Sequence, residues 1–191
     1  PVLPPLRYIG QLLDGYLVAE APGAAVLVDQ HAAHERVLFE GIMERLEARR
    51  PSSQMFLIPH VVEMSAPQAV AFEQHESWLR SLGFEGAGFG PERIRLTAAP
   101  AELPESRINM VLTRVLDDLG TERTPDRRLR ETAALIACHS AIRFGDRIQP
   151  EAATQLLSSL AATTNPISCP HGRPTTLILP DSQLRHLFKR P

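Results

Sequence analysis

Three short clusters of carboxylate, imidazole and thiol side chains stand out in this sequence of 191 residues. They are Asp29-Gln30-His31-Ala32-Ala33-His34-Glu35, Ala137-Cys138-His139 and Cys169-Pro170-His171. Side chains of these types bind divalent metal ions in proteins, and cysteine together with histidine favours zinc. We therefore expect the three clusters to converge on one divalent-metal site.

The first cluster is expected where a strand passes into a helix. Asp29 ends an apolar run, and His31 and Glu35 lie four residues apart, so they share one helical face and can share an ion with Asp29. His34 lies near that face and either joins them or reaches solvent, whereas Glu40 lies about 180° from His31 and is expected outside the site. The alternative is structural, with Asp29 as a helix cap and His31 and Glu35 as ordinary surface residues.

The two later clusters contribute the sulfur atoms. Cys169 and His171 lie in a loop rich in proline and glycine, and Arg173 is a candidate phosphate contact two residues later. Cys138 lies on an apolar helix face, where it is either a ligand or a buried structural cysteine, and His139 points about 100° away from it. A disulfide between the two cysteines is the alternative to metal binding.

Composition limits the class of protein. A hydrophobic content of 43% supports a core in one domain or in two small ones. We find no apolar run of membrane-spanning length and no signal peptide, so we expect an intracellular, cytoplasmic chain without a membrane partner. The net charge of −2 argues against a generally basic surface, so any contact with DNA is expected to be local or assisted. The proline-rich start looks like the end of a linker in a longer protein.

Hydrophobic periodicity predicts the elements that must position these residues. Strands are expected at residues 7–13, 16–20, 25–29, 54–64, 93–97 and 175–179. Helices are expected at residues 31–50, 67–82, 104–119, 127–143 and 150–162, and from a capping Asp181 to about Arg190. Glycine and proline predict loops at 83–91 and 165–174 and a break at 120–125.

Asp29-Gln30-His31-Ala32, followed by Glu35 and then Glu40, resembles the DQHA(X)2E(X)4E endonuclease motif of MutL-type mismatch-repair proteins. The resemblance continues, in family order, through Ala137-Cys138-His139-Ser140-Ala141-Ile142-Arg143, Ser168-Cys169-Pro170-His171-Gly172-Arg173-Pro174 and the ending Phe188-Lys189-Arg190. It therefore covers nearly the whole chain. It implies the C-terminal region of a MutL protein that nicks DNA, without the N-terminal ATPase region of the family.

The resemblance also implies a fold and partners. The expected class is α+β, with a mixed or antiparallel sheet and helices at 1–52 and 124–191 as the dimerisation and endonuclease subdomain. A smaller α+β external regulatory subdomain is expected as an insertion at 53–123. The implied partners are DNA, a second copy of the chain and a MutS-type mismatch recognition protein, in a nucleoid-associated setting. Apolar residues near the end suit either a dimer interface or a core, namely Leu177, Ile178, Leu179, Leu184, Leu187 and Phe188.

One further segment, Gln54-Met55-Phe56-Leu57-Ile58-Pro59, resembles the motif with which the family docks on the sliding clamp. The expected contacts are Gln54, Leu57, Ile58 and Pro59, because aliphatic residues in an extended peptide suit an apolar groove. A buried strand would explain the same residues equally well.

The leading hypothesis for function is metal-dependent hydrolysis of a phosphodiester in one strand of DNA. By resemblance, zinc is structural or regulatory, whereas manganese or magnesium supports cleavage. The catalytic candidates are Asp29, His31 and Glu35, and the metal-ligand candidates are these three with Cys138, Cys169 and His171. Asp29 is the candidate for the hard catalytic ion.

Two other classes of protein stay open. One is a non-catalytic module for dimerisation and partner docking, stapled by zinc in a closed site with four ligands. The other is a cysteine hydrolase that uses Cys169 or Cys138 with a histidine. The hydrolase leaves the carboxylates unexplained, and Cys169 and His171 are too close in sequence for the usual spatially assembled pair.

Overall fold

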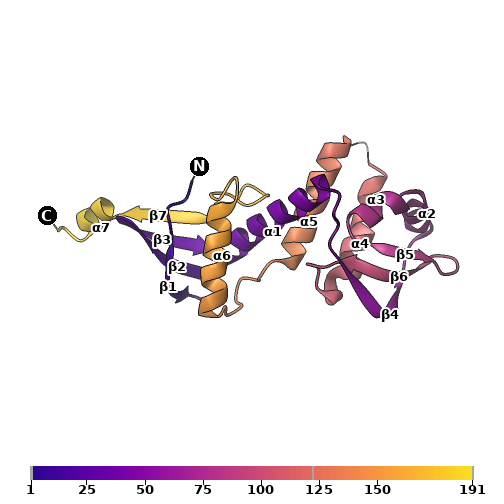
Figure 1. Ribbon diagram of the computed structural model, residues 1–191, viewed down its shortest axis with the longest axis horizontal. Coiled ribbons are helices and arrows are strands. Elements are labelled where there is room, and N and C mark those ends of the chain that lie inside the picture. Colours follow the sequence, from indigo (N-terminus) through magenta and orange to yellow (C-terminus); the bar gives the residue numbers. More distant parts are fainter. Residues whose placement is uncertain (1, 122, 191) are drawn as a thin grey trace. The chain divides into compact units, whose positions relative to one another are not determined.

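The computed structural model describes residues 2–121 and 123–190 and divides into two compact units. Unit 1 comprises Pro1–Glu40 and Ala141–Pro191, and unit 2 comprises Gly41–Ser140. Within the described residues, seven helices accompany two antiparallel sheets, which confirms the α+β prediction. Helix α1 (Gln30–Glu47) begins in unit 1 and ends in unit 2 (Figure 1). The predicted division, with residues 53–123 as an inserted subdomain, stays a prediction.

Unit 1 is built on a four-stranded antiparallel sheet in the order β1-β2-β3-β7. Its strands are β1 (Arg7–Leu12), β2 (Tyr16–Ala21), β3 (Ala24–Asp29) and β7 (Thr176–Pro180). Figure 1 shows β7, from the far end of the sequence, beside β3, and Val26 is opposite Ile178 in that pairing. The sheet therefore joins both ends of the chain around the start of α1.

The turn between β1 and β2 shows why Gly15 is a glycine. Leu13 and Asp14 have φ values of 52° and 46°, which is the backbone of a type I′ hairpin turn. Gly15 itself does not have a positive φ, but a Cβ there would collide with the ring of Phe144. The absence of a Cβ at Gly15 therefore allows Phe144 to pack closely on the hairpin. The conformation of the turn does not require a glycine at this position.

Helix α6 (Pro150–Ala162) covers one face of this sheet and forms the core of unit 1. Pro150 suits the first turn of the helix, where its missing N–H costs no hydrogen bond. Apolar residues three to four positions apart on α6 then pack against inward-facing residues of the strands. The buried cluster includes Leu17, Val26, Val28, Leu156, Leu157 and Leu160.

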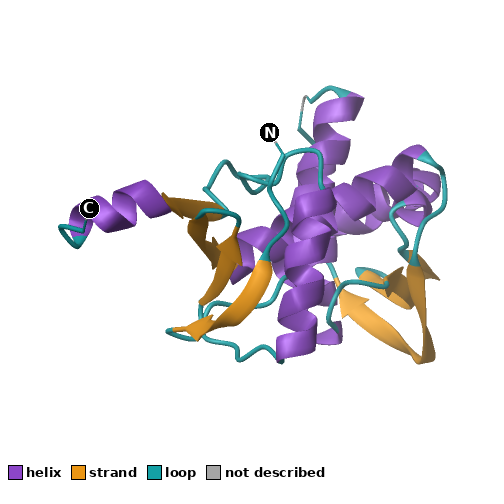
Figure 2. Ribbon diagram, turned by 60° about the vertical axis from the view of Figure 1, so that its left-hand side comes forward, coloured by secondary structure: helices purple, strands orange, loops and turns teal. Residues whose placement is uncertain are grey.

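Unit 2 contains a three-stranded antiparallel sheet in the order β4-β6-β5. The strands are β4 (Ser53–Glu63), β5 (Glu85–Gly88) and β6 (Arg93–Pro100), and the helices are α2 (Ala66–Gln74), α3 (Glu76–Ser81), α4 (Glu105–Leu119) and α5 (Pro125–Ser140). Figure 2 distinguishes these strands from the helices beside them. Helix α4 buries a continuous apolar stripe, formed by Ile108, Val111, Leu112, Val115 and Leu116.

Two predictions in unit 2 were wrong for local reasons. The helix predicted at 67–82 is two helices, because His75 leaves helical geometry with φ −116° and ψ 23°. The loop predicted at 83–91 contains strand β5. Gly86 permits that pairing, since a Cβ there would lie 2.7 Å from the carbonyl oxygen of Arg95. The glycine marks a close approach of two strands rather than a loop.

The last helix, α7 (Asp181–Leu187), also differs from its prediction. Its N-cap is Pro180, and the carboxylate of Asp181 instead accepts a hydrogen bond from Nε of Arg185 at 2.7 Å. The predicted cap was therefore wrong, and the helix ends before Arg190. Among the helices in the described ranges, none has the length and apolar character that a membrane span requires.

Candidate metal centre

The centre is organised around the first turn of α1, directly after β3. Oδ1 of Asp29 accepts a hydrogen bond from the backbone N–H of Ala32 at 2.9 Å, so Asp29 caps the helix. This is the structural role that the sequence left open for Asp29. Within the described residues, Asp29 is not among the side chains whose ligand atoms gather most closely.

Gln30, the second residue of the first cluster, is a fully buried polar hub. Its Nε2 lies within hydrogen-bond distance of the carbonyl oxygens of Asp14, Arg143 and Asp146, at 3.1, 3.0 and 2.9 Å. Its Oε1 accepts a hydrogen bond from Nε2 of Gln11 at 2.7 Å. Gln30 therefore fixes the segment 142–146 against the hairpin and the start of α1.

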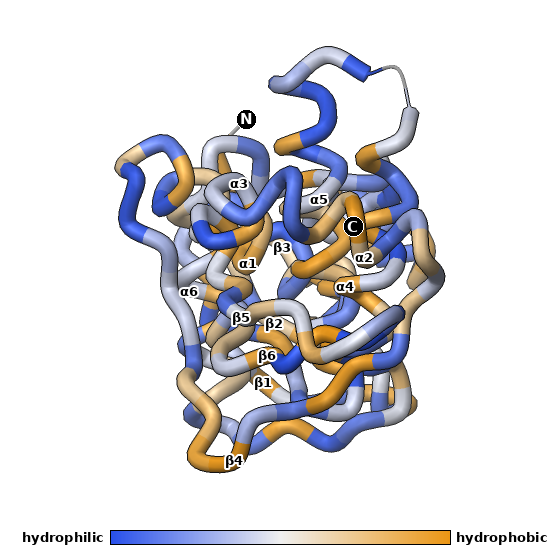
Figure 3. Tube along the Cα trace, turned by 90° about the vertical axis from the view of Figure 1, so that its right-hand side faces the viewer, coloured by the Kyte–Doolittle hydropathy of each residue, from blue (hydrophilic) through white to orange (hydrophobic). Residues whose placement is uncertain are grey.

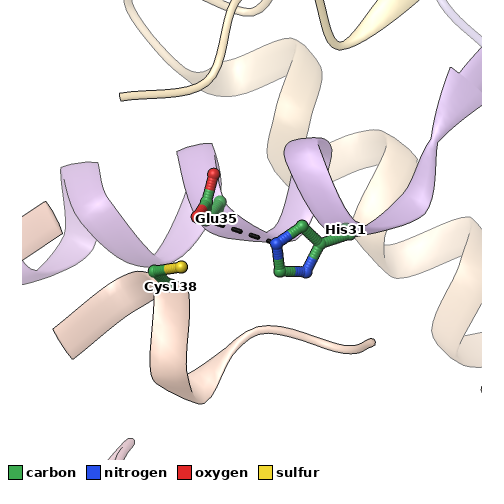
Figure 4. Close-up of side chains that lie close together, drawn as sticks. All are labelled: His31, Glu35 and Cys138. Carbon is green, nitrogen blue, oxygen red and sulfur yellow. Dashed lines mark ion pairs between the residues drawn. The ribbon is translucent and has the colours of Figure 1, made fainter. Parts of the chain in front are cut away.

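The backbone of Ile142, in that same segment, orients two histidines. Nδ1 of His31 lies 2.8 Å from the carbonyl oxygen of Ile142, and Nδ1 of His34 accepts the N–H of Ile142 at 3.0 Å. Because a carbonyl only accepts, Nδ1 of His31 carries a proton, so the neutral tautomer that fits this bond has its lone pair on Nε2. Figure 4 shows that this ring faces Glu35 one turn later, and Nε2 lies 3.7 Å from Oε1. Histidine ligands of metals are commonly held in this way.

His34 is structural in this arrangement. Burial lowers the pKa of its ring below the usual 6.5, and the neighbouring His31 lowers it further. A neutral ring is required for Nδ1 to accept the N–H of Ile142. His34, which is half-buried, therefore does not supply this nitrogen to an ion.

Glu35, Cys169 and His171 bring their ligand atoms close together within unit 1. One ligand atom from each lies within 4.8 Å of the others. Nδ1 of His171 is 3.3 Å from Oε1 of Glu35, and ligands bound at about 2.05 Å to one tetrahedral zinc lie about 3.4 Å apart. The Glu35 side chain is only 3% exposed and Cys169 only 1%. The spacing is compatible with one tetrahedral ion, and the half-exposed His171, at 47%, lies on the solvent side of the two buried residues.

The loop that carries Cys169 and His171 is folded tightly on itself. The N–H of Cys169 donates to the carbonyl of Arg173 at 2.8 Å, and the N–H of Gly172 donates to the carbonyl of Cys169 at 3.0 Å. Gly172 has φ +83°, a conformation that favours glycine. This turn presents the thiol and the imidazole on the same side as Glu35.

The donor set fits a divalent ion, zinc best. Burial is the main factor that raises the pKa of the Cys169 thiol; backbone hydrogen bonds from Arg173 and His171 oppose it, and Glu35 adds to it. A neutral thiol at Cys169 thus faces the buried carboxylate of Glu35. A divalent cation among these atoms would stabilise the thiolate and offset the burial of the charge on Glu35.

The remaining residues that the sequence analysis singled out are Cys138, Arg173 and Glu40. Cys138, also drawn in Figure 4, is half-buried on α5 in unit 2, and its membership of the centre stays a prediction. Arg173 is exposed beside His171. The carboxylate of Glu40 binds backbone groups of Thr164 and Asn165, away from the ligand group, as its helical position predicted.

Sequence reasoning missed the supporting residues Gln30 and Ile142. A signal for Gln30 was present, because it lies three and seven positions before Ala33 and Val37, which pack in the core of unit 1. A polar residue on such a face must find buried partners. The role of Ile142 had no signal, since it uses only main-chain atoms.

Comparisons with known proteins place this geometry in context. Residues 9–148 match the family model described as the MutL C terminal dimerisation domain. The chain is similar to the DNA mismatch repair protein MutL of Acidobacterium capsulatum, with 38% identity over 97% of this chain and 28% of the relative. It is 35% identical to those of Symbiobacterium thermophilum, over 97% of this chain and 30% of the relative, and Agrobacterium fabrum, over 100% and 32%. The chain thus spans less than a third of these relatives.

Proposed function

This chain belongs to the MutL family, and from that premise we propose that it is a metal-dependent endonuclease domain that hydrolyses a phosphodiester in one DNA strand during mismatch repair. The observation that supports this most strongly is the gathering of Glu35, Cys169 and His171 within 4.8 Å. His31 lies one turn before Glu35, with the lone pair of Nε2 toward it. These four residues offer nitrogen and sulfur donor atoms beside the buried carboxylate of Glu35.

The proposal assigns zinc to the sulfur and imidazole donors, and manganese or magnesium to carboxylate oxygen. Glu35, His31, Cys169 and His171 would hold the first ion. Asp29 would offer its second carboxylate oxygen to the harder ion, since Oδ1 is committed to the helix cap. A bound ion activates water and neutralises charge on the scissile phosphate.

The protein groups around the ions have their own tasks in this proposal. The Ile142 carbonyl keeps His31 in the tautomer that leaves Nε2 available. The exposed guanidinium of Arg173 can bind the DNA phosphate through paired hydrogen bonds. With a net charge of −2, the chain lacks a broad basic surface, so affinity for DNA must come largely from local contacts or from partners.

Nicking of supercoiled plasmid tests this proposal. The full-length protein with manganese should convert the plasmid to the open-circular form, and Asp29→Asn should reduce the rate by at least about a hundredfold if this carboxylate holds the ion. Asp117→Asn, an exposed change in unit 2, is the matched control. Equal nicking by wild type and Asp29→Asn would refute the role of Asp29, and absence of nicking by the wild type would favour a module stapled by zinc.

A second part of the proposal is docking on a sliding clamp through β4. The register of β4 against β6 shifts between Met55 and His60, so the intervening residues depart from regular pairing. Leu57 is 99% exposed and Ile58 78% exposed there. Figure 3 colours this part of β4 as hydrophobic. An exposed apolar segment in an extended conformation suits a peptide-binding groove on a partner.

Gln54 needs a change of conformation to join that contact. Its Nε2 donates to the carbonyl oxygens of Pro100 and Leu103, at 3.1 and 2.6 Å. The proposal therefore rests on Leu57, Ile58 and the exposed Pro59. Replacing Leu57 and Ile58 by alanine should weaken binding to purified clamp at least tenfold in a surface-binding assay. Unchanged binding would remove clamp docking from the proposal.

We assign homodimerisation to the apolar end of unit 1. Exposed apolar side chains occur on β7 and in and after α7, namely Leu177, Ile178, Leu187 and Phe188. Such a surface is typical of a subunit interface. Sedimentation of Leu177→Arg should show a shift toward monomer, because an unpaired charge would be buried in the interface. An unchanged dimer would exclude Leu177 from it.

A further inference from the structure

We propose that Glu40 is a positioning residue that clamps the ligand-bearing loop, so that Cys169 and His171 meet Glu35 in a preformed arrangement. The inference rests on the metal site of the proposed function. It assigns to Glu40 a task distinct from binding the ion. The clamp comprises Glu40 and Arg36 on α1 and the loop residues Thr164, Asn165 and Ser168.

The contacts of Glu40 are directed at the beginning of the loop. Oε2 accepts the backbone N–H of Thr164 at 2.7 Å, and Oε1 accepts the hydroxyl of Thr164 at 2.9 Å and the N–H of Asn165 at 3.2 Å. Helix α6 ends at Ala162, with Thr163 as its C-cap. One carboxylate therefore fixes the direction in which the chain leaves α6.

Arg36 holds the other end of the same segment. Its Nε donates to the carbonyl of Ser168 at 2.6 Å, and Nη1 lies 3.4 Å from Oε1 of Glu40. Nδ2 of Asn165 donates to the Ser168 hydroxyl at 2.9 Å. Ser168 directly precedes Cys169, so the network ends one residue from a candidate ligand. The Arg36 side chain is only 9% exposed, which makes these bonds hard for water to replace.

Helix geometry explains why Glu40 serves the loop and not the ion. Glu40 lies five residues after Glu35, which is about 140° around the helix. Arg36 is adjacent to Glu35, and Glu40 is four residues after Arg36, so these two share a face. Helix α1 thus supplies a ligand and the clamp from one rigid element, and it fixes the position of the loop ligands relative to the helix ligand.

The clamp has a measurable consequence for metal affinity. Without it, ion binding must order the loop at the cost of conformational entropy. Loss of a supporting contact around a metal site typically weakens binding about 10–100-fold. We expect Glu40→Gln to raise the dissociation constant for cobalt(II) at least about tenfold, because the new amide N–H₂ faces donors instead of accepting from them.

Cobalt(II) titration of this chain, followed by visible absorption, tests the inference. The thiolate-to-cobalt band reports cobalt bound by cysteine and should require at least about tenfold more cobalt to develop in Glu40→Gln. Hydrogen exchange of Thr164 and Asn165 amides should accelerate in the metal-free variant. Glu44→Gln, an exposed change one turn later on α1, is the matched control and should change neither.

The outcomes separate the two proposals. Absence of cobalt binding by the wild-type chain would overturn the metal site itself. Wild-type affinity in Glu40→Gln, whether exchange is faster or unchanged, would overturn the clamp alone. If Glu40→Gln does not fold, Thr164→Val decides, because it removes only the hydroxyl bond to Glu40. A rise of at least threefold in the dissociation constant supports the clamp, and an unchanged constant refutes it.

Discussion

Replacing the buried hub residue Gln30 by leucine should destabilise unit 1 while keeping nearly the same side-chain volume. The side chain has 0% exposure, and leucine would remove every polar contact that it makes. The carbonyls of Asp14, Arg143 and Asp146 would then lose a donor, and Gln11 would lose an acceptor. Packing alone would be largely conserved, so the change reports on the hydrogen bonds.

The expected magnitude follows from the number of protons available. The Nε2 amide has two protons for three carbonyls, so it makes about two full hydrogen bonds, and Oε1 accepts a third. At about 1 kcal/mol net for each bond, the loss is about 3 kcal/mol. Carbonyls left unsatisfied in the interior would increase that value, whereas burial of the leucine methyl groups would reduce it.

Urea unfolding followed by circular dichroism measures this loss. Gln155→Leu on the exposed side of α6 is the matched control and should change stability by less than about 0.5 kcal/mol. The double variant of Gln11→Leu and Gln30→Leu should be less destabilised than the sum of the single variants by about 1 kcal/mol, because both remove the same bond. If Gln30→Leu lowers the free energy of unfolding by less than about 1 kcal/mol, the hydrogen bonds of Gln30 do not stabilise unit 1 as argued.

Three further predictions follow from the same unit. The folded pKa of His34 lies below 6.5, so the unfolded chain takes up the proton first and stability should fall as pH drops below about 6.5, then level off below the folded pKa. His34→Gln should lose this slope between about pH 7.5 and 5.5, and an unchanged slope would contradict the assignment. Gly15→Ala should cost about 1–3 kcal/mol through collision with Phe144, and a double-mutant cycle with Phe144→Ala should recover most of it; simple additivity would argue against the collision. Zinc should raise the melting temperature of the chain, and Cys169→Ser should abolish that rise; a persistent rise would exclude Cys169 as a ligand.

Local sequence signals could predict much of the centre. The apolar run ending at Asp29 predicted β3, and the four-residue spacing of His31 and Glu35 correctly placed them on one face of α1. Proline and glycine around Cys169 predicted a loop. These features depend on residues close together in sequence, so hydrophobic periodicity and the residue types that favour turns are sufficient to predict them.

The features that the sequence did not predict depend on contacts between residues distant in sequence. No local pattern indicates that Glu40 receives the N–H of Thr164, 124 residues later. Gly86 could not be distinguished from a loop glycine, because its reason is the close approach of Arg95 on another strand. His75 interrupts a helix that its neighbours favour, and the capping box of Ser65 and Gln68 fixes only the start of α2. Tertiary contacts decide such positions over local propensity.

Unit 1 is formed from two separate segments of the sequence, and this affects the order in which the two units fold during synthesis. Strand β3 gains its neighbour β7 only near the end of the sequence, and Glu35 meets His171 across 136 residues. Synthesis proceeds from the N-terminus at about 5–20 residues per second, and domains tend to fold as they emerge. The contiguous unit 2 can therefore fold while unit 1 still has an open edge at β3. The proposed metal centre would be among the last features to form, since a chain that stops before Cys169 lacks two of the candidate ligands.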